Sequence, residues 1–393
     1  MTSNPPETGH GGIWRLLAPL ALGVFAGTLV ARLTDPLVGV LAHDLDASTT
    51  RVALLASAFA LPFALIQPIL GPVGDALGKR RVIAVGLGLL SAILAISSLA
   101  PSLDALLVLR ALSGLAAGMV MPLTIALVGD SVPMRDRQVA LSRLLAVVIT
   151  GQIAGGTIAG LLEPWLGWRG IFLAAATLAG CAVVAILLNA RTCPPEPRHP
   201  FDVAQALQRY RDLMRMPAAR LLYASVAIEG GLVFGCFTYF VPILSARGLG
   251  GAAQAGLALA GFGCGGLLYA AIAKAVLRQI GQGHMVMLGG LLCLLAMTGF
   301  AFAPTAWMFI GAGVFLGTGM YMIHNSIQTR VTELTPHARG SAVALHAFHF
   351  FVGQTLGPLV YGFMFAHAGA APTLLLAGFC LLGLAVVLGR YRG

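Results

Sequence analysis

The sequence predicts an all-α membrane protein with twelve transmembrane helices arranged in two pseudo-symmetric six-helix bundles. The first observation is composition, because 58% of the 393 residues are hydrophobic and only 10% are charged. Soluble domains carry about 25% charged residues, so most of this surface must face lipid rather than water. The second observation is a set of twelve long apolar stretches, and the third is an internal repeat that relates the two halves.

The apolar stretches are each close to the length that a helix needs to cross the hydrocarbon core, about 20 residues. Fifty glycines are spread among them, which suits the close packing of helices in lipid. The twelve predicted spans lie near residues 16–40, 52–72, 82–100, 105–128, 140–162, 169–190, 220–245, 253–277, 284–303, 306–328, 340–366 and 371–389.

The basic residues predict the topology. Nineteen of the 24 Lys and Arg residues fall on the side of the two termini, and only Arg51, Arg169 and Arg247 fall in loops on the other side. Since basic loops stay in the cytoplasm, both termini are expected there, and a bacterial inner membrane is expected. The longest polar segment divides the chain into a first bundle (1–190), a proline-rich linker with an amphipathic helix (191–219) and a second bundle (220–393).

Two short matches relate the halves. GQIAGGTIAG starts at Gly151 in span five and GQTLGPLVYG starts at Gly353 in span eleven, an offset of 202 residues. Gly118-Met119-Val120-Met121 in span four matches Gly319-Met320-Tyr321-Met322 in span ten, an offset of 201. A parallel repeat of six spans implies a pseudo-twofold axis along the membrane normal, with a binding site between the halves.

The loop between spans two and three reads GPVGDALGKRR, and it resembles motif A of the major facilitator superfamily, G-x-L-x-D-x-x-G-R-[KR]. The resemblance extends over essentially the whole chain and implies the fold of that superfamily. It also implies that Asp75 locks span two against span eleven in the outward-facing state, and that Asp130 is the acidic partner of the basic group. The matching positions are Gly71, Asp75, Gly78, Lys79 and Arg80.

Two further segments resemble family motifs. Arg110, followed by Gly114 and Gly118, resembles motif B, in which an intramembrane arginine serves proton transfer. Span five resembles the antiporter motif C, but Gly156 stands where proline is expected and Ala159 where a glycine is expected, which weakens the case for antiport. The helix-packing residues implied in spans five and eleven are Gly151, Gly155, Gly160, Gly353, Gly357 and Pro358. The subfamily implied is the twelve-span drug and metabolite efflux proteins.

Ionisable residues inside a membrane are costly and are therefore functional candidates. In the first half, Asp35 lies one turn after Arg32, and Arg110 lies in a span that would face the same cavity. These three residues are predicted to form either a proton- or substrate-linked switch or a permanent ion pair. The two interpretations remain open.

In the second half, Glu229 is the only acid within the six spans, and no Lys or Arg lies at its depth. It is therefore predicted to carry protons, with His324 as its hydrogen-bond partner. His346 and His349 are predicted to be either functional or simply packed. Three histidines and a glutamate lack the tight spacing of a metal site, so no metal is expected.

Adaptable methionine and aromatic side chains suit an amphiphilic or aromatic substrate, although interhelical packing is the better explanation for each of them taken singly. The predicted cavity residues are Phe25, Arg32, Met119, Met121, Phe234, Tyr239, Met320, Tyr321 and Asn325.

These observations predict a secondary transporter that exports a small organic molecule, coupled to protons, and that acts as a monomer without a cofactor. The alternative is uptake of a sugar, nucleoside, carboxylate or similar metabolite by proton symport or facilitated diffusion. A membrane-embedded enzyme is disfavoured because no nucleophile–base pair is recognisable. The basic residues form no patch interleaved with aromatics, so nucleic acid is not an expected partner, and the six scattered cysteines predict no disulfide framework.

Overall fold

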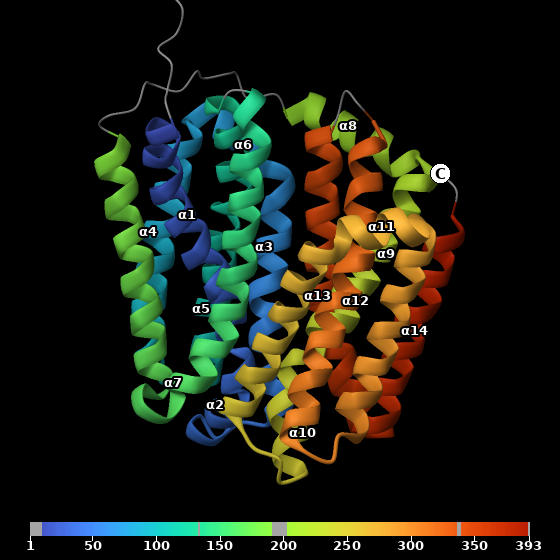
Figure 1. Cartoon of the computed structure of the whole chain (residues 1–393). Helices are drawn as coiled ribbons and strands as arrows, with labels where there is room; N and C mark the ends of the chain where they lie inside the picture. The colour runs from blue at the N-terminus through green and yellow to red at the C-terminus, as the bar shows by residue number, and fades with distance from the viewer. Residues whose placement is uncertain (1–9, 133, 191–202, 336–338, 392–393) are drawn as a thin grey trace, which may run out of the picture.

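The computed structural model describes residues 10–132, 134–190, 203–335 and 339–391, and every regular element within them is a helix. Figure 1 shows the helices standing roughly parallel in two adjoining groups, the first half of the chain on the left and the second on the right. The elements are α1 His10–Arg32, η1 Asp35–Leu37, α2 Val38–Asp44, α3 Thr49–Leu77, α4 Lys79–Ser97, α5 Leu103–Gly118, α6 Met121–Ser131, α7 Met134–Ala190, α8 Val203–Arg215, α9 Pro217–Gly235, η2 Phe237–Tyr239, α10 Phe240–Ala246, α11 Ala252–Phe302, α12 Ala306–Glu333, α13 Arg339–Ala368 and α14 Ala370–Arg390.

The described residues contain ten helical segments long and apolar enough to cross a membrane, and two of these are double crossings. α7 has 57 residues and α11 has 51, so a straight α7 would be about 85 Å long. Each is interrupted by a glycine with non-helical angles, Gly167 and Gly281. Figure 1 shows the chain reversing direction at both glycines. The reversal within α7 lies at the end opposite the C-terminus, and the reversal within α11 lies nearer the C-terminal end. The prediction of an all-α membrane fold with twelve spans is confirmed.

The tight turns between spans repeat in the second half. Gly78 (φ +91°) joins α3 to α4, and Gly281 (φ +72°) stands 203 residues later. Gly167 (φ +61°) and Gly369 (φ +81°) are separated by 202 residues. A positive φ at all four positions permits a reversal with almost no loop, which only glycine does without strain.

The packing of the predicted motif glycines repeats as well. A Cβ on Gly155 would lie 2.1 Å from the Leu29 carbonyl oxygen of α1, and a Cβ on Gly357 would lie 2.4 Å from the Gly231 oxygen of α9. Gly155 and Gly357 are 202 residues apart, and so are the residues whose carbonyls they face, Leu29 and Gly231. The same contact therefore fastens α7 to α1 in the first half and α13 to α9 in the second. Gly151 and Gly353 meet α1 and α9 one turn earlier, and Gly160 meets the α11 backbone.

Three spans are broken: the first after α1, the fourth between α5 and α6, and the seventh after α9. α1 ends at Arg32, four residues before Pro36, which has no N–H to bond the Arg32 carbonyl. The short helices η1 and η2 that follow α1 and α9 contact each other across the two halves. Irregular backbone of this kind is tolerated at membrane depth where it is buried in protein or lines a cavity.

Each half has its own apolar core, and the halves meet along two helix pairs, α3 with α13 and α7 with α11. Ser57 donates a hydrogen bond to the Thr355 carbonyl over 2.6 Å, and Thr157 donates to the Gly256 carbonyl over 3.1 Å. The boundaries predicted at residues 190 and 220 stay a prediction, and residues 191–202 of the linker lie outside the described part of the chain.

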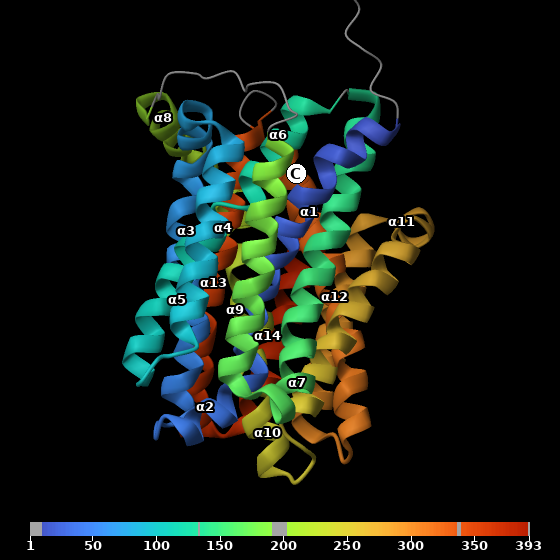
Figure 2. The same ribbon diagram turned by 90° about the vertical axis from the view of Figure 1, so that its left-hand side faces the viewer.

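The amphipathic helix α8 lies at the end of the molecule that carries the C-terminus, beside the upper end of α3 in Figure 2. The Tyr210 hydroxyl donates a hydrogen bond to the Pro68 carbonyl of α3 over 2.8 Å. That carbonyl is free because the residue four positions later is Pro72, which has no N–H. Tyr210 of the linker therefore donates to a carbonyl of α3 that has no hydrogen-bond donor within its own helix.

Candidate substrate and coupling site

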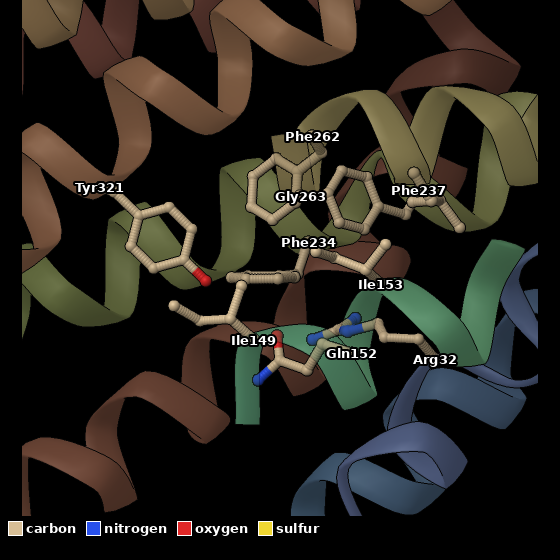
Figure 3. A pocket seen from close by; sticks show the side chains of 10 residues that line it. Arg32, Ile149, Gln152, Ile153, Phe234, Phe237, Phe262, Gly263 and Tyr321 are labelled. Carbon is tan, nitrogen blue, oxygen red and sulfur yellow. The ribbon is translucent and has the colours of Figure 1, made fainter. Parts of the chain in front are cut away.

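Two internal cavities share Arg32 and Gln152, which places them side by side between the halves. The first is narrow and is lined mainly by second-half residues, four of them aromatic, as Figure 3 shows. The second is somewhat larger and is lined mainly by α1 and α13. The first is lined by Arg32, Ile149, Gln152, Ile153, Phe234, Phe237, Leu259, Phe262, Gly263 and Tyr321. The second is lined by Val24, Gly27, Thr28, Ala31, Arg32, Phe63, Ala117, Val120, Met121, Gln152, Phe351 and Gln354.

Arg32 is the charged side chain common to both cavities, and only 7% of it is exposed. One Nη atom lies 3.6 Å from an Asp35 oxygen, and the other donates a hydrogen bond to the Gln354 side chain. Its guanidinium lies over the Phe234 ring, 4.1 Å from the centroid. Phe234 is the residue 202 positions after Arg32, so the two residues are repeat equivalents in contact and lie on the pseudo-twofold axis.

Arg110 is fully buried and caps the broken end of α1. It donates to the Val30 carbonyl over 3.1 Å and to the Thr34 hydroxyl over 3.4 Å, and its guanidinium lies 4.5 Å from the Phe59 ring centroid. A cation is favourable at a helix C-terminus, where the unbonded carbonyls carry partial negative charge. Asp35 sits within the electrostatic reach of both arginines and is also fully buried.

Glu229 and His324 form the second polar cluster. Glu229 on α9 is fully buried, and one carboxylate oxygen lies 2.9 Å from His324 Nδ1 on α12. Its other oxygen has no hydrogen-bond partner among the described residues. The His346 ring is 5.2 Å from the His324 ring, whereas His349 stacks on Tyr223 and bonds its own helix. The described residues contain no group of three or more metal-ligating side chains.

An aromatic wall separates the two polar clusters. Phe234 carries Arg32 on one face and meets Phe350 edge-on at 5.4 Å, and Phe350 lies 4.8 Å from the His324 ring. Two phenylalanines in edge-to-face contact therefore lie between the guanidinium and the histidine.

Of the predicted cavity residues, four line the cavities in this conformation and five do not. Arg32, Met121, Phe234 and Tyr321 line them. Tyr239 and Met320 are instead packed in the second-half core, with the Tyr239 hydroxyl bonded to the Pro358 carbonyl. Phe25 and Met119 pack against the first-half core, and Asn325 also lies outside both cavities. The roles of all nine residues stay predictions.

The reasoning from sequence missed the two glutamines. Gln152 and Gln354 are repeat equivalents and both line the larger cavity, on either side of Arg32. The signal that could have found them is the Q of the shared GQxxGxxxxG pattern, of which only the glycines were used.

At the loop that resembles motif A, Lys79 Nζ lies 3.0 Å from an Asp130 oxygen, joining α4 to the end of α6. The side chain of Asp75 lies outside the part of the chain that the structure describes. The switching role of the motif stays a prediction.

Two six-span repeats that meet around central cavities with a buried arginine are the architecture of secondary transporters. The family model of the Major Facilitator Superfamily matches residues 20–358 and 250–392. The chain belongs to this superfamily of transporters.

Relatives of known sequence and one solved structure agree with this assignment. The chain is 26% identical to the uncharacterized MFS-type transporter YceJ of Bacillus subtilis, covering 86% of this chain and 87% of the relative. It is 24% identical to the quinolone resistance protein NorA of Staphylococcus aureus (94% and 95% covered), and 23% identical to multidrug resistance protein 1 of Bacillus subtilis (89% of each). The crystal structure of the nucleoside transporter NupG matches with a TM-score of 0.75 over 95% of this chain and 98% of that one, at 16% identity.

Proposed function

We propose that this transporter exports a small organic or amphiphilic molecule in exchange for protons, by alternating access across a bacterial plasma membrane. Both termini face the cytoplasm, and the protein works as a monomer without enzymatic activity. The observation that carries the coupling is Glu229, a fully buried acid whose one hydrogen-bond partner among the described residues is a histidine. An acid in lipid without a fixed cation exchanges its proton rather than holding a permanent charge.

Alternating access is supported by where the halves touch. The η1–η2 contact, the Ser57–Thr355 bond and the Thr157–Gly256 bond hold the halves together on the side away from the termini. With the termini in the cytoplasm, this conformation is closed towards the outside. Release of the substrate outward then requires the halves to rock apart at these contacts, while the glycine-packed helix pairs within each half move as rigid units.

Export is favoured by the relatives whose names describe resistance to quinolones and to several drugs. The second candidate, uptake by proton symport or facilitated diffusion, is favoured by Gly156, which replaces the proline expected in the antiporter motif. The two functions differ in the direction of proton flow relative to substrate.

Everted membrane vesicles with an imposed pH gradient provide the test. A panel of labelled organic compounds is offered while internal pH is followed with a fluorescent dye. An exporter accumulates its substrate when the lumen is acidic, and the lumen becomes more alkaline as it does so. Movement of substrate and protons in the same direction would establish symport, and gradient-independent equilibration would establish facilitated diffusion.

A further inference from the structure

The polar atoms that face the two cavities are mainly donors without partners. Arg32 Nε and Gln354 Nε2 are buried and have no hydrogen-bond partner, and both side chains are more than nine-tenths buried. The Gln152 amide and the Tyr321 hydroxyl, which also line the smaller cavity, have no hydrogen-bond partner in the described part of the chain. In Figure 3 the Arg32 guanidinium reaches towards Gln152, and the Tyr321 hydroxyl points into the same space. Buried donors left unpaired are costly, so the site calls for a ligand with acceptor atoms.

The charge around this space is positive. No acid is among the residues that line either cavity, and Arg32 is the charged residue common to both. Asp35 forms an ion pair with Arg32 at 3.6 Å, and neither of its oxygens has a hydrogen-bond partner in the described part of the chain. Two arginines, Arg32 and Arg110, thus share one carboxylate, which leaves one positive charge in excess. Buried charges are normally paired, and a single negative charge on a ligand would complete this set.

The second acid of the membrane interior does not change this balance. Glu229 lines neither cavity and is bonded to His324, although its charge reaches the Tyr321 hydroxyl. A lipophilic cation would lie close to the Arg32 guanidinium, which already covers one face of Phe234, and no acid lines the cavity to balance the two charges.

From these contacts we propose that the cavity binds an amphiphilic monoanion, with a carboxylate as its head group. The head group accepts hydrogen bonds from Arg32 Nε and Gln354 Nε2, and the apolar body lies among Phe234, Phe262 and Tyr321. The inference rests on the proposed function insofar as this cavity is the transport site. It adds the charge of the substrate, which neither the fold nor the relatives specify.

Binding at equilibrium, without any gradient, tests the charge class. Purified full-length protein in detergent is examined by equilibrium dialysis with labelled benzoate, 2-naphthoate and octanoate. Each is compared with the amide and the primary amine of the same carbon skeleton. We expect at least one carboxylate to bind about tenfold more tightly than its amide, equivalent to about 1.4 kcal/mol, and the amines to bind most weakly. Equal binding of all three forms, tighter binding of the amines, or no binding by any probe overturns the proposal.

Two variants move the affinity in opposite directions. Arg32→Gln is expected to raise the dissociation constant of the carboxylate about tenfold, to that of the amide, and to leave the amide unchanged. Asp35→Asn is expected to lower the dissociation constant of the carboxylate probe by a similar factor, because it removes the negative charge that competes for Arg32. Tightening is a result that a purely structural ion pair would not give, and it remains measurable if Arg32→Gln fails to fold. Unchanged carboxylate affinity in a folded Asp35→Asn protein overturns the proposal.

Arg51→Gln is the matched control, because it also removes one positive charge, but from an exposed pair with Asp104. It should leave all dissociation constants as they are. Since these binding measurements use no proton gradient, they test the anion site separately from the proposed proton coupling. Selective binding of carboxylates without gradient-driven transport would refute proton coupling but support the anion site. Gradient-driven transport of amines alone would support coupling and refute the anion site.

Discussion

Glu229→Gln tests the coupling role of the buried acid with little change of shape. Glutamine occupies the same space and retains an oxygen and an amide that can bond His324, which lies 2.9 Å from the carboxylate. It cannot take up or release a proton. The substitution exchanges a hydrogen bond between ionisable groups for a neutral one, a loss of about 1 kcal/mol, so the protein should still fold and insert.

The size of the effect follows from the energy in the gradient. One pH unit supplies about 1.4 kcal/mol per proton, so a carrier that exchanges one proton per substrate accumulates its substrate at most about tenfold. If Glu229 is the group that carries the proton, the variant has no way to use that energy. Its accumulation ratio should fall to about one, while substrate exchange without a gradient continues, because neither cavity is lined by this residue.

The assay is uptake into everted vesicles with an acidic lumen, followed by counterflow at equal pH on both sides. Glu333→Gln is the control, because it removes an exposed carboxylate from α12, the helix that also bears His324. Tenfold accumulation by Glu229→Gln would refute the assignment of coupling to this residue. Loss of both accumulation and counterflow would instead show that the acid is needed for the conformational change itself.

Three other substitutions probe the framework. Tyr210→Phe leaves the proline-freed carbonyl of α3 without its donor, so the thermal stability should drop by about 1 kcal/mol, and an unchanged melting curve would contradict the bond. Lys79→Met should reduce the initial transport rate by up to about fivefold, the effect of an ion pair worth at most about 1 kcal/mol. The charge-swapped protein Lys79→Asp with Asp130→Lys should recover most of that rate if the pair acts as a pair. Gly155→Val places a Cβ 2.1 Å from a backbone oxygen of α1 and should abolish folded expression, whereas Gly129→Ala, with no neighbour within 4 Å, should be tolerated.

Much of the architecture could be predicted from the sequence because lipid makes hydropathy and length decisive. All twelve crossings were visible, including the pairs on either side of Gly167 and Gly281, since only an apolar stretch of the right length can span the membrane. The repeat was visible because close helix contacts restrict side chains at Gly155 and Gly357 to hydrogen.

The lining of the cavities was harder to predict, and the reason is physical. A helix packed between helices and lipid is apolar on every side, so its sequence gives depth without telling which face it turns to the centre. Met320 and Tyr321 are neighbours on α12, yet the first is in the core and the second lines a cavity. Gln152 and Gln354 were overlooked because their neighbouring glycines drew the interpretation towards packing.

The pseudo-symmetry also explains how two different chemistries share one centre. Arg32 stacks on its own repeat equivalent, Phe234, so one position of the ancestral pattern is a cation in the first half and an aromatic face in the second. Glu229 is the equivalent of Gly27, which lines the larger cavity and has no side chain. The two buried arginines therefore belong to the first half and the Glu229–His324 pair to the second. Rocking of the halves changes the contact between Arg32 on α1 and Phe234 on α9, whereas Phe234, Phe350, His324 and Glu229 all belong to the second half. If Glu229 carries the coupled proton, as proposed, Phe234 and Phe350 are the contacts through which its loss would alter substrate binding at Arg32.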